Sequence, residues 1–261
     1  LRVEPYGPDL ATRLPGADWL LSIANLTVLP PAVLSRAIKG AVNFHDGPLP
    51  RYAGLDAPVG AILNGEARHG ITWHLIEGGI DEGDILEQRL FDIAPTDTAL
   101  TLNTRCFEAA IESFPALLTQ LESGILQRKA QDLTRRSLYM RHDRPAAMGR
   151  IDFTTSVAAV LRLIRSLDHG RYWNPLTTAK IATANGVLNV GAAEPAEGMG
   201  TPGAVLAADD SGLVVACADG AVRLMKLTCQ HKGLPVSATS ITDAILPQVL
   251  AGLSQATDGI A

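Results

Sequence analysis

The amino-acid sequence predicts an α/β protein, with a doubly wound sheet in its first half and a small β-barrel in its second half. Between Asp18 and Glu122, apolar runs alternate with helical patterns, the order typical of a doubly wound sheet. A polar, basic stretch at residues 127–148 interrupts this pattern. From Leu176 onward, short strand-like runs are separated by turn residues, a spacing that indicates a barrel.

Four strands are predicted in the first half. Each is a short apolar or alternating run bounded by glycine, proline or polar residues. Residues 46–57 between the second and third strands are rich in glycine and proline and predict a loop, and Glu77–Gly83 predict a glycine-rich turn. The strands are expected at Asp18–Ala24, Ala41–His45, Gly70–Ile76 and Ile85–Phe91.

Two helices are expected between these strands, at Ala32–Lys39 and Pro58–Leu63, and a third, at Ala99–Glu122, after the last strand. Pro30–Pro31 and Gly40 punctuate the first helix as a helix start and stop. The third helix carries apolar residues at helical spacing over its whole length. Pro115 lies inside it and is expected to kink it.

The second half divides into further segments. We expect a catalytic domain at residues 1–126, a linker at 127–149, a barrel domain at 150–238, and a helix with a polar tail at 239–261. The barrel strands are expected at Val187–Val190, Ala204–Ala207, Leu213–Cys217 and Ala221–Leu227. Amphipathic helices are expected at Ser156–Leu167 and Ile241–Leu253.

Composition excludes several classes of function. The 261 residues carry a net charge of −5 and no large basic cluster, which argues against a nucleic-acid partner. No apolar run is long enough to span a membrane, and no signal peptide is visible. The three cysteines are far apart and form no CxxC pair, which fits free thiols in a reducing cytoplasm.

Asn43, His45 and Asp81 form the candidate catalytic set. Asn43 and His45 are two residues apart at a strand end, so their side chains share a face. Asp81 follows the next strand and can face the imidazole. An amide can donate to an oxyanion, and a carboxylate can orient a histidine. The set contains no nucleophile, which favours direct attack of an amine on an activated carbonyl.

Two other interpretations of these residues remain open at this point. An asparagine and a histidine on a strand are often only structural hydrogen-bonding residues. His45, His74 and Asp81 could instead hold zinc, although Asn43 has no role in such a site. His74 lies on the strand that leads to Asp81, and we interpret it as a core histidine or as a support for the site.

Two sequence motifs give a more specific interpretation. The run N-F-H-D-G-P-L-P-R-Y-A-G from Asn43 to Gly54, followed by I-E-G-G-I-D-E-G-D-I-L from Ile76 to Leu86, resembles the formyltransferase family. The resemblance places the family's catalytic residues on Asn43, His45 and Asp81. It implies 10-formyltetrahydrofolate as the formyl donor and no metal. It also implies a Rossmann-like domain followed by an OB-like barrel.

The same resemblance locates the folate-binding segments. The pterin slot of the family is formed largely by backbone groups of two stretches. The first corresponds to Leu26–Leu29, with the side chains of Leu26, Val28 and Leu29, for which core packing is the other interpretation. The second is the turn before the catalytic aspartate, which here comprises Ile76, Glu77, Gly78, Gly79 and Ile80.

The sequence departs from the family pattern in two places. Asn43 comes some tens of residues early, so we expect the first β-α-β portion to be missing by truncation or incomplete order. The loop form D-G-P-L-P-R-Y-A-G resembles formyltransferase domains of nonribosomal peptide synthetases. This implies an amino-acid or carrier-bound amine as acceptor, with a carrier protein and further synthetase domains as partners.

Four alternatives to that acceptor and activity remain. The acceptor could be methionyl-tRNA or a sugar amine. The domain could also hydrolyse the donor to formate, or bind folate without catalysis.

Overall fold

The computed structural model describes residues 2–184, 186–230 and 233–241, which form two compact units. Of the described residues, the first unit comprises 2–61, 65–97 and 101–143, and the second comprises 62–64, 98–100 and those from 144 onward. Within the described residues, no helix is both long and apolar enough to cross a membrane.

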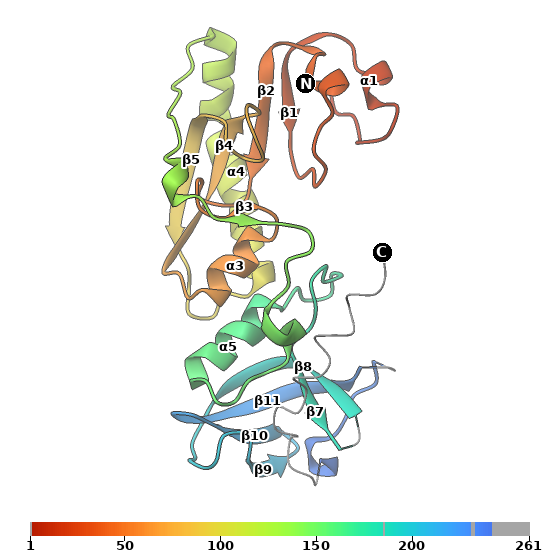
Figure 1. Ribbon diagram of the computed structural model, residues 1–261, viewed down its shortest axis with the longest axis vertical. Helices are drawn as coiled ribbons and strands as arrows, with labels where there is room; N and C mark the ends of the chain where they lie inside the picture. Colours follow the sequence, from red (N-terminus) through yellow and green to blue (C-terminus); the bar gives the residue numbers. More distant parts are fainter. Residues whose placement is uncertain (1, 185, 231–232, 242–261) are drawn as a thin grey trace. The chain divides into compact units, whose positions relative to one another are not determined.

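The sheet of the first unit has the strand order β1-β2-β4-β5 (Figure 1). The strands are β1 (Ala17–Ser22), β2 (Ala37–His45), β4 (Arg68–Leu75) and β5 (Ile85–Asp92). All four predicted strands are therefore present. β1 and β2 run parallel, but β4 pairs antiparallel with both β2 and β5. The sheet of this unit is therefore mixed rather than uniformly parallel. The sequence could not predict this, because the alternation of strand and helix patterns along a sequence does not encode strand direction.

The prediction of a helix over Ala32–Lys39 is wrong in its second half. Helix α2 spans only Pro31–Leu34, and the chain enters β2 at Ala37. Ala37 pairs with Ala17 of β1, so the ladder takes residues that the local pattern assigned to a helix. Gly40 lies inside β2 rather than ending a helix, with φ +144°, and a Cβ there would lie 3.1 Å from the Trp19 ring.

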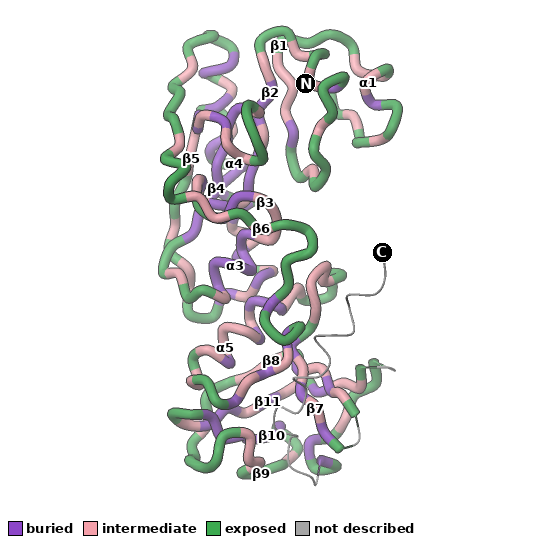
Figure 2. The backbone as a smooth tube through the Cα atoms, viewed as in Figure 1, coloured by how far each residue is buried: buried purple, intermediate pink, exposed green. Residues whose placement is uncertain are grey.

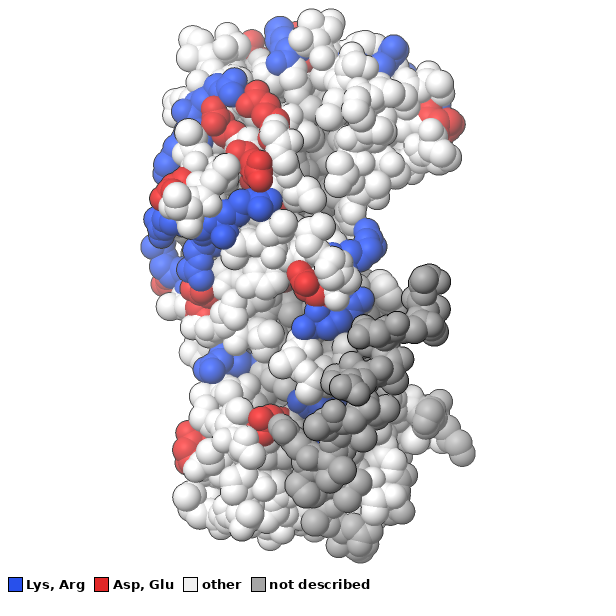
Figure 3. All heavy atoms as spheres, viewed as in Figure 1, with Lys and Arg blue, Asp and Glu red and all other residues white. Residues whose placement is uncertain are grey.

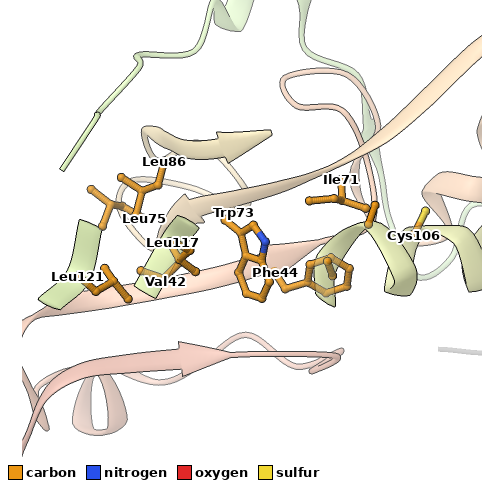
Figure 4. Packing of buried hydrophobic residues seen from close by; sticks show 11 residues of the cluster. Val42, Phe44, Ile71, Trp73, Leu75, Leu86, Cys106, Leu117 and Leu121 are labelled. Atoms are coloured by element: carbon orange, nitrogen blue, oxygen red, sulfur yellow. The ribbon is translucent and has the colours of Figure 1, made fainter. Parts of the chain in front are cut away.

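Helix α4 (Ala99–Ser123) supplies one wall of the main hydrophobic core, and the sheet supplies the other. It continues through Pro115 as one helix. Trp73 lies at the centre of this core, with ring centroids 5.2 Å from Phe44 and 5.5 Å from Phe114. Figure 4 shows the cluster, and Figure 2 shows the buried stretches of β2, β4 and α4 that form it.

The segment expected to be a linker makes specific contacts in the first unit. It contains a 3-10 turn at Leu133–Arg135 and strand β6 (Leu138–Tyr139). β6 pairs in parallel with β3 (Ala53–Gly54), next to the glycine- and proline-rich loop. A Cβ on Gly54 would lie 2.0 Å from the carbonyl oxygen of Tyr139, so this pairing requires glycine there. Residues up to 143 therefore pack as part of the first unit.

The second unit contains a five-stranded antiparallel sheet in the order β7-β8-β11-β10-β9. The four predicted strands are present inside longer ones, and β7 was not predicted. Within the described residues no ladder joins the edge strands β7 and β9, so closure of this sheet into the expected OB-like barrel stays a prediction. The strands are β7 (Lys180–Thr183), β8 (Gly186–Ala196), β9 (Val205–Asp209), β10 (Gly212–Cys217) and β11 (Gly220–Cys229).

Helix α5 (Val157–Ser166) packs against β8 and β11. The Ser156 hydroxyl accepts from the Ala159 amide and caps the helix. The helix predicted at Ile241–Leu253 lies outside the described residues, apart from Ile241. The remaining short elements are α1 (Leu10–Arg13), α3 (Ala57–Leu63), and 3-10 turns at Ala146–Gly149 and Ala238–Ser240.

Candidate active site

The candidate site lies where β2 and β4 pair side by side in the first unit (Figure 1). Asn43 and His45 are on β2, and His74 is the cross-strand partner of Asn43 on β4. Asp81 lies on the turn that joins β4 to β5. The sheet therefore gathers side chains that are more than thirty residues apart in the sequence.

His45 is buried, and its two ring nitrogens face different groups. Nε2 lies 2.6 Å from the carbonyl oxygen of Tyr52, which can only accept, so Nε2 carries the hydrogen. Nδ1 lies 3.6 Å from Asp81 Oδ2 and 3.9 Å from Asp46 Oδ1. Nε2 is therefore engaged by the backbone, and Nδ1 is the ring nitrogen that faces the two carboxylates.

Asp81 lies between two imidazoles. Its Oδ2 accepts a hydrogen bond from the Gly54 amide at 2.7 Å, and its Oδ1 lies 3.3 Å from His74 Nε2. Burial raises the pKa of Asp81, but the hydrogen bond with His74, the charge of His45 and the Gly54 amide together lower that pKa to about 2. The carboxylate is therefore ionised at neutral pH.

The turn that carries Asp81 is held in a specific backbone conformation. Asp81 has φ +56°, a left-handed conformation that aspartate and asparagine tolerate better than most residues. The Gln131 side-chain amide donates to the carbonyls of Asp81 (2.8 Å) and Gly83 (2.7 Å). Arg136 donates to the Ile80 carbonyl at 2.6 Å. The segment from 127 to 143 thus fixes the position of the catalytic candidate.

Gly83 is expected to be essential for this turn. An added Cβ would lie 1.8 Å from the carbonyl oxygen of Leu75, so Gly83→Ala must displace backbone rather than a flexible side chain. We expect Gly83→Ala to lower kcat at least on the order of 10²-fold, because a misplacement of about 1 Å can cost that much in rate. Steady-state kinetics and circular dichroism test this expectation. Gly16→Ala is the control, since nothing lies within 4 Å of a Cβ there and Gly16 is not among the glycines with a positive φ. Equal activity in both variants would contradict the expectation.

Tyr52 positions His45 through its backbone, a role that sequence reasoning missed. Its φ is +60°, and its amide donates to the Ser137 hydroxyl at 2.8 Å. Its own hydroxyl donates to Glu66 at 2.8 Å, and its ring stacks on Tyr139 with centroids 5.7 Å apart. These contacts hold the carbonyl that accepts from His45. The only signal in the sequence was the place of Tyr52 within the L-P-R-Y run.

The first predicted folate-binding segment is largely open to solvent. Leu26 and Val28 are 70% and 74% exposed, so the core-packing interpretation is wrong for both. Leu29 is partly buried. The Leu26 carbonyl accepts a hydrogen bond from Arg141 at 3.2 Å.

The second predicted segment is also mostly exposed. The Ile76 amide donates to the Ala41 carbonyl at 2.8 Å, and Gly79 donates to Glu82 at 2.9 Å. Glu77 pairs with Arg128, which also pairs with Asp84. Figure 3 shows basic and acidic side chains interspersed on the face drawn. A hollow of about 230 Å³ adjoins Ile76 and Glu77, and Trp19, Lys39 and Gly40 also line it.

A metal site receives no support from the geometry. Across the residues that the structure describes, no group of three or more histidine, cysteine, aspartate or glutamate side chains is arranged to hold a metal ion. One ring nitrogen of His45 and one of His74 are engaged by backbone carbonyls, of Tyr52 and Leu75 respectively.

The arrangement defines a class of chemistry. An amide donor, an ionised carboxylate and two imidazoles can stabilise an oxyanion and move a proton. His45, His74, Asn43 and Asp81 include no serine or cysteine that could form a covalent intermediate. This set of groups is suited to direct transfer of a group between two bound substrates.

Comparison with known proteins identifies which group-transfer family this is. Residues 11–118 match the formyl transferase family, and residues 145–242 match the formyl transferase C-terminal domain. Methionyl-tRNA formyltransferase of Ectopseudomonas mendocina (strain ymp) is 30% identical over 97% of this chain and 77% of its own length. The chain belongs to the formyltransferase family.

Solved structures share the fold at lower identity. HypX from Aquifex aeolicus, in complex with tetrahydrofolic acid, is 21% identical with a TM-score of 0.69, over 90% of this chain and 40% of that one. An N-formyltransferase from Helicobacter canadensis, in complex with folinic acid and dTDP-3-aminofucose, is 19% identical with a TM-score of 0.64, over 84% of this chain and 77% of that one. This chain thus spans less than half of HypX.

Proposed function

We propose that this formyltransferase moves a formyl group from 10-formyltetrahydrofolate to an amine, with Asn43, His45 and Asp81 as its catalytic residues. The observation that carries the proposal is the ionised Asp81 between His45 and His74, next to Asn43. The folate donor is supported by the two structural neighbours, whose complexes contain tetrahydrofolic acid and folinic acid.

The reaction joins the amine nitrogen to the formyl carbon and breaks the bond from that carbon to N10 of the folate. The acceptor amine loses a proton and N10 gains one, so charge and atoms balance. Asn43 donates to the oxyanion of the tetrahedral intermediate. His45 in its protonated form stabilises that oxyanion through charge, and Asp81 positions His45 and takes the amine proton, directly or through water.

Two segments are proposed to hold the donor. Exposed apolar side chains at Leu26 and Val28, with Leu29, would contact the pterin ring. Ile76, Glu77, Gly78, Gly79 and Ile80 would contact it chiefly through their backbone groups. The exposure of both segments supports this assignment, because neither is occupied by the core of the first unit.

For the acceptor, we propose the amine of an amino acid, free or bound to a carrier protein within a peptide synthetase. The net charge of −5 favours such an acceptor over a polyanion. The D-G-P-L-P form of the loop also supports it, because this form resembles formyltransferase domains of nonribosomal peptide synthetases. Methionyl-tRNA is the second candidate, because relatives bearing that name are 30% identical over nearly the whole chain.

Loss of either proposed catalytic residue on β2, Asn43 or His45, is expected to slow formyl transfer strongly. We expect Asn43→Ala or His45→Ala to lower kcat on the order of 10²–10³-fold, because each removes stabilisation of the oxyanion. Mass spectrometry should follow the formylated product from 10-formyltetrahydrofolate and a panel of amines, including carrier-bound amino acids, amino sugars and methionyl-tRNA. His142→Ala is the control, since that histidine is far more exposed, at 83% of its side chain.

The same assay separates the rival functions. Formate release without a formylated amine would indicate a hydrolase. Folate binding without turnover would indicate a binding domain, and unchanged transfer in both variants would remove Asn43 and His45 from the mechanism.

A further inference from the structure

Asp46 is a second carboxylate beside His45, and the proposed mechanism gives it no role. Its Oδ1 lies 3.9 Å from His45 Nδ1, the ring nitrogen that Asp81 Oδ2 also faces at 3.6 Å. The Asp46 side chain is 31% exposed, whereas that of Asp81 is 11% exposed. Of the two carboxylates, Asp46 is therefore the one that a bound acceptor reaches more easily.

The main chain of Asp46 is held by two buried groups. His69 Nε2 lies 2.8 Å from the Asp46 carbonyl oxygen, and Cys106 Sγ lies 3.8 Å from it. Both residues are 0% exposed. Burial lowers the pKa of His69 to about 4, so this ring is neutral at neutral pH, and burial raises the pKa of the Cys106 thiol. These neutral groups fix the backbone and supply no positive charge for the carboxylate.

The Asp46 carboxylate keeps its capacity to accept hydrogen bonds. Among the residues that the structure describes, no donor hydrogen-bonds to either of its oxygens, and its one ion-pair partner is His45 at 3.9 Å. In Asp81, by contrast, Oδ2 accepts from the Gly54 amide and Oδ1 lies 3.3 Å from His74 Nε2. An ionised carboxylate can accept about four hydrogen bonds. Asp46 can therefore take several donors from a ligand.

The proposed acceptor has the complementary charge. An aliphatic amine is mostly an ammonium at neutral pH, because its ordinary pKa lies above 7. An ammonium carries three N–H donors and no lone pair, so it cannot attack a carbonyl until it has lost a proton. Asn43 and His45 are assigned to the oxyanion, which is negative. The ammonium therefore needs a different group, and that group must be an anion within reach of the formyl carbon.

We propose that Asp46 binds the ammonium group of the acceptor, so that the site selects cationic alkyl amines over neutral nitrogen nucleophiles. The inference rests on the proposed formyl transfer and names the class of acceptor. Asp46 holds the ammonium beside Asp81, which takes one of its protons, and the neutral amine then attacks the formyl carbon. The titratable groups around Asp46 are His45, His69, Cys106 and Asp81, and no lysine or arginine in the described part of the chain pairs with it.

Asp46→Asn tests the loss of the charge at constant shape. With the best acceptor of the amine panel, we expect it to raise KM for that acceptor on the order of 10- to 100-fold, the cost of a hydrogen bond between charged groups. KM for 10-formyltetrahydrofolate should not change. Asp46→Glu should restore part of the affinity, because it keeps the charge. Asp92→Asn is the control, since that side chain is 89% exposed and pairs with Arg68.

The pH dependence of KM separates this role from an effect through His45. In the unmodified enzyme, KM for the acceptor should rise as the pH passes above the pKa of its amine, because the ammonium form disappears. In Asp46→Asn this rise should be absent, since the amide does not prefer the ammonium. The same rise in both proteins, or no rise in either, would overturn the proposal. So would an Asp46→Asn loss confined to kcat.

A binding measurement tests the site without turnover. The enzyme is saturated with folinic acid in place of the donor, and the ¹³C signal of the Asp46 carboxyl is followed by NMR at neutral pH. Propylamine hydrochloride should shift this signal saturably, whereas 1-propanol, its neutral counterpart, should not. No shift, or equal shifts with both compounds, would overturn the proposal even if formyl transfer is observed. Absence of transfer to any amine would overturn the proposed function, while a selective shift at Asp46 would still establish the ammonium site.

Discussion

Asp81→Asn is expected to lower kcat on the order of 10⁴-fold, the cost known for replacing a carboxylate that orients a catalytic histidine. Asparagine has the same shape and accepts the positive φ at this position, so the backbone should be retained. The amide nitrogen would carry hydrogens toward either His45 or His74, where a carboxylate oxygen now lies. Steady-state kinetics of formyl transfer measure the loss.

The pH dependence of stability provides the control for this variant. The pKa of Asp81 in the folded protein is about 2, below its ordinary value of 3.8. Its contribution to stability is therefore fully present above the ordinary value and is lost as the pH falls toward 2. Asp81→Asn should cost on the order of 2 kcal/mol at pH 7 and almost nothing at pH 2. A loss of stability independent of pH would contradict the assigned contacts.

Trp73→Ala is expected to cost about 3–5 kcal/mol of unfolding free energy, the usual range for removing a buried tryptophan. Trp73 is 2% exposed and contacts aromatic rings from β2 and α4. Its Nε1 donates to the Ser113 hydroxyl at 3.0 Å. That hydroxyl also donates to the Ala110 carbonyl, so the cost comes mainly from the cavity. Urea denaturation of the whole chain measures this loss of unfolding free energy, in the transition of the first unit.

Trp173→Ala is the matched control for the core variant. Trp173 is 82% exposed, so its loss should change stability by no more than about 0.5 kcal/mol. Equal shifts in the two variants would mean that the aromatic cluster around Trp73 contributes little. If the two units unfold separately, only the transition of the first unit should move in Trp73→Ala.

The sequence predicted correctly those helices and strands whose position follows from the pattern of their own residues. The apolar runs gave the positions of β4 and β5, and the spacing of apolar residues gave α4. The failure at Ala37–Lys39 has a different origin, because only pairing with β1 makes that segment a strand. The direction of β4 likewise depends on its neighbours. β7 was missed because Lys180–Thr183 is short and becomes a strand by pairing with β8.

The site shows the same limit. Side-chain alternation placed Asn43 and His45 on one face, and the turn after β4 placed Asp81 within reach. The roles of Tyr52 and Gln131 could not be read from the sequence. Tyr52 acts through a main-chain carbonyl, and Gln131 holds a turn fifty residues away. His74 was noticed, but its contact with Asn43 depends on the cross-strand register.

The contacts of Gln131 and Arg136 have a consequence for how formyltransferase modules can be recombined. A module ending at residue 126 would keep Asn43, His45 and Asp81 but lose the side chains that hold the carbonyls of Ile80, Asp81 and Gly83. It would also lose β6 and with it the partner of β3. A productive crossover between related formyltransferase genes is therefore expected beyond residue 143, so that residues 127–143 are inherited together with the turn they hold.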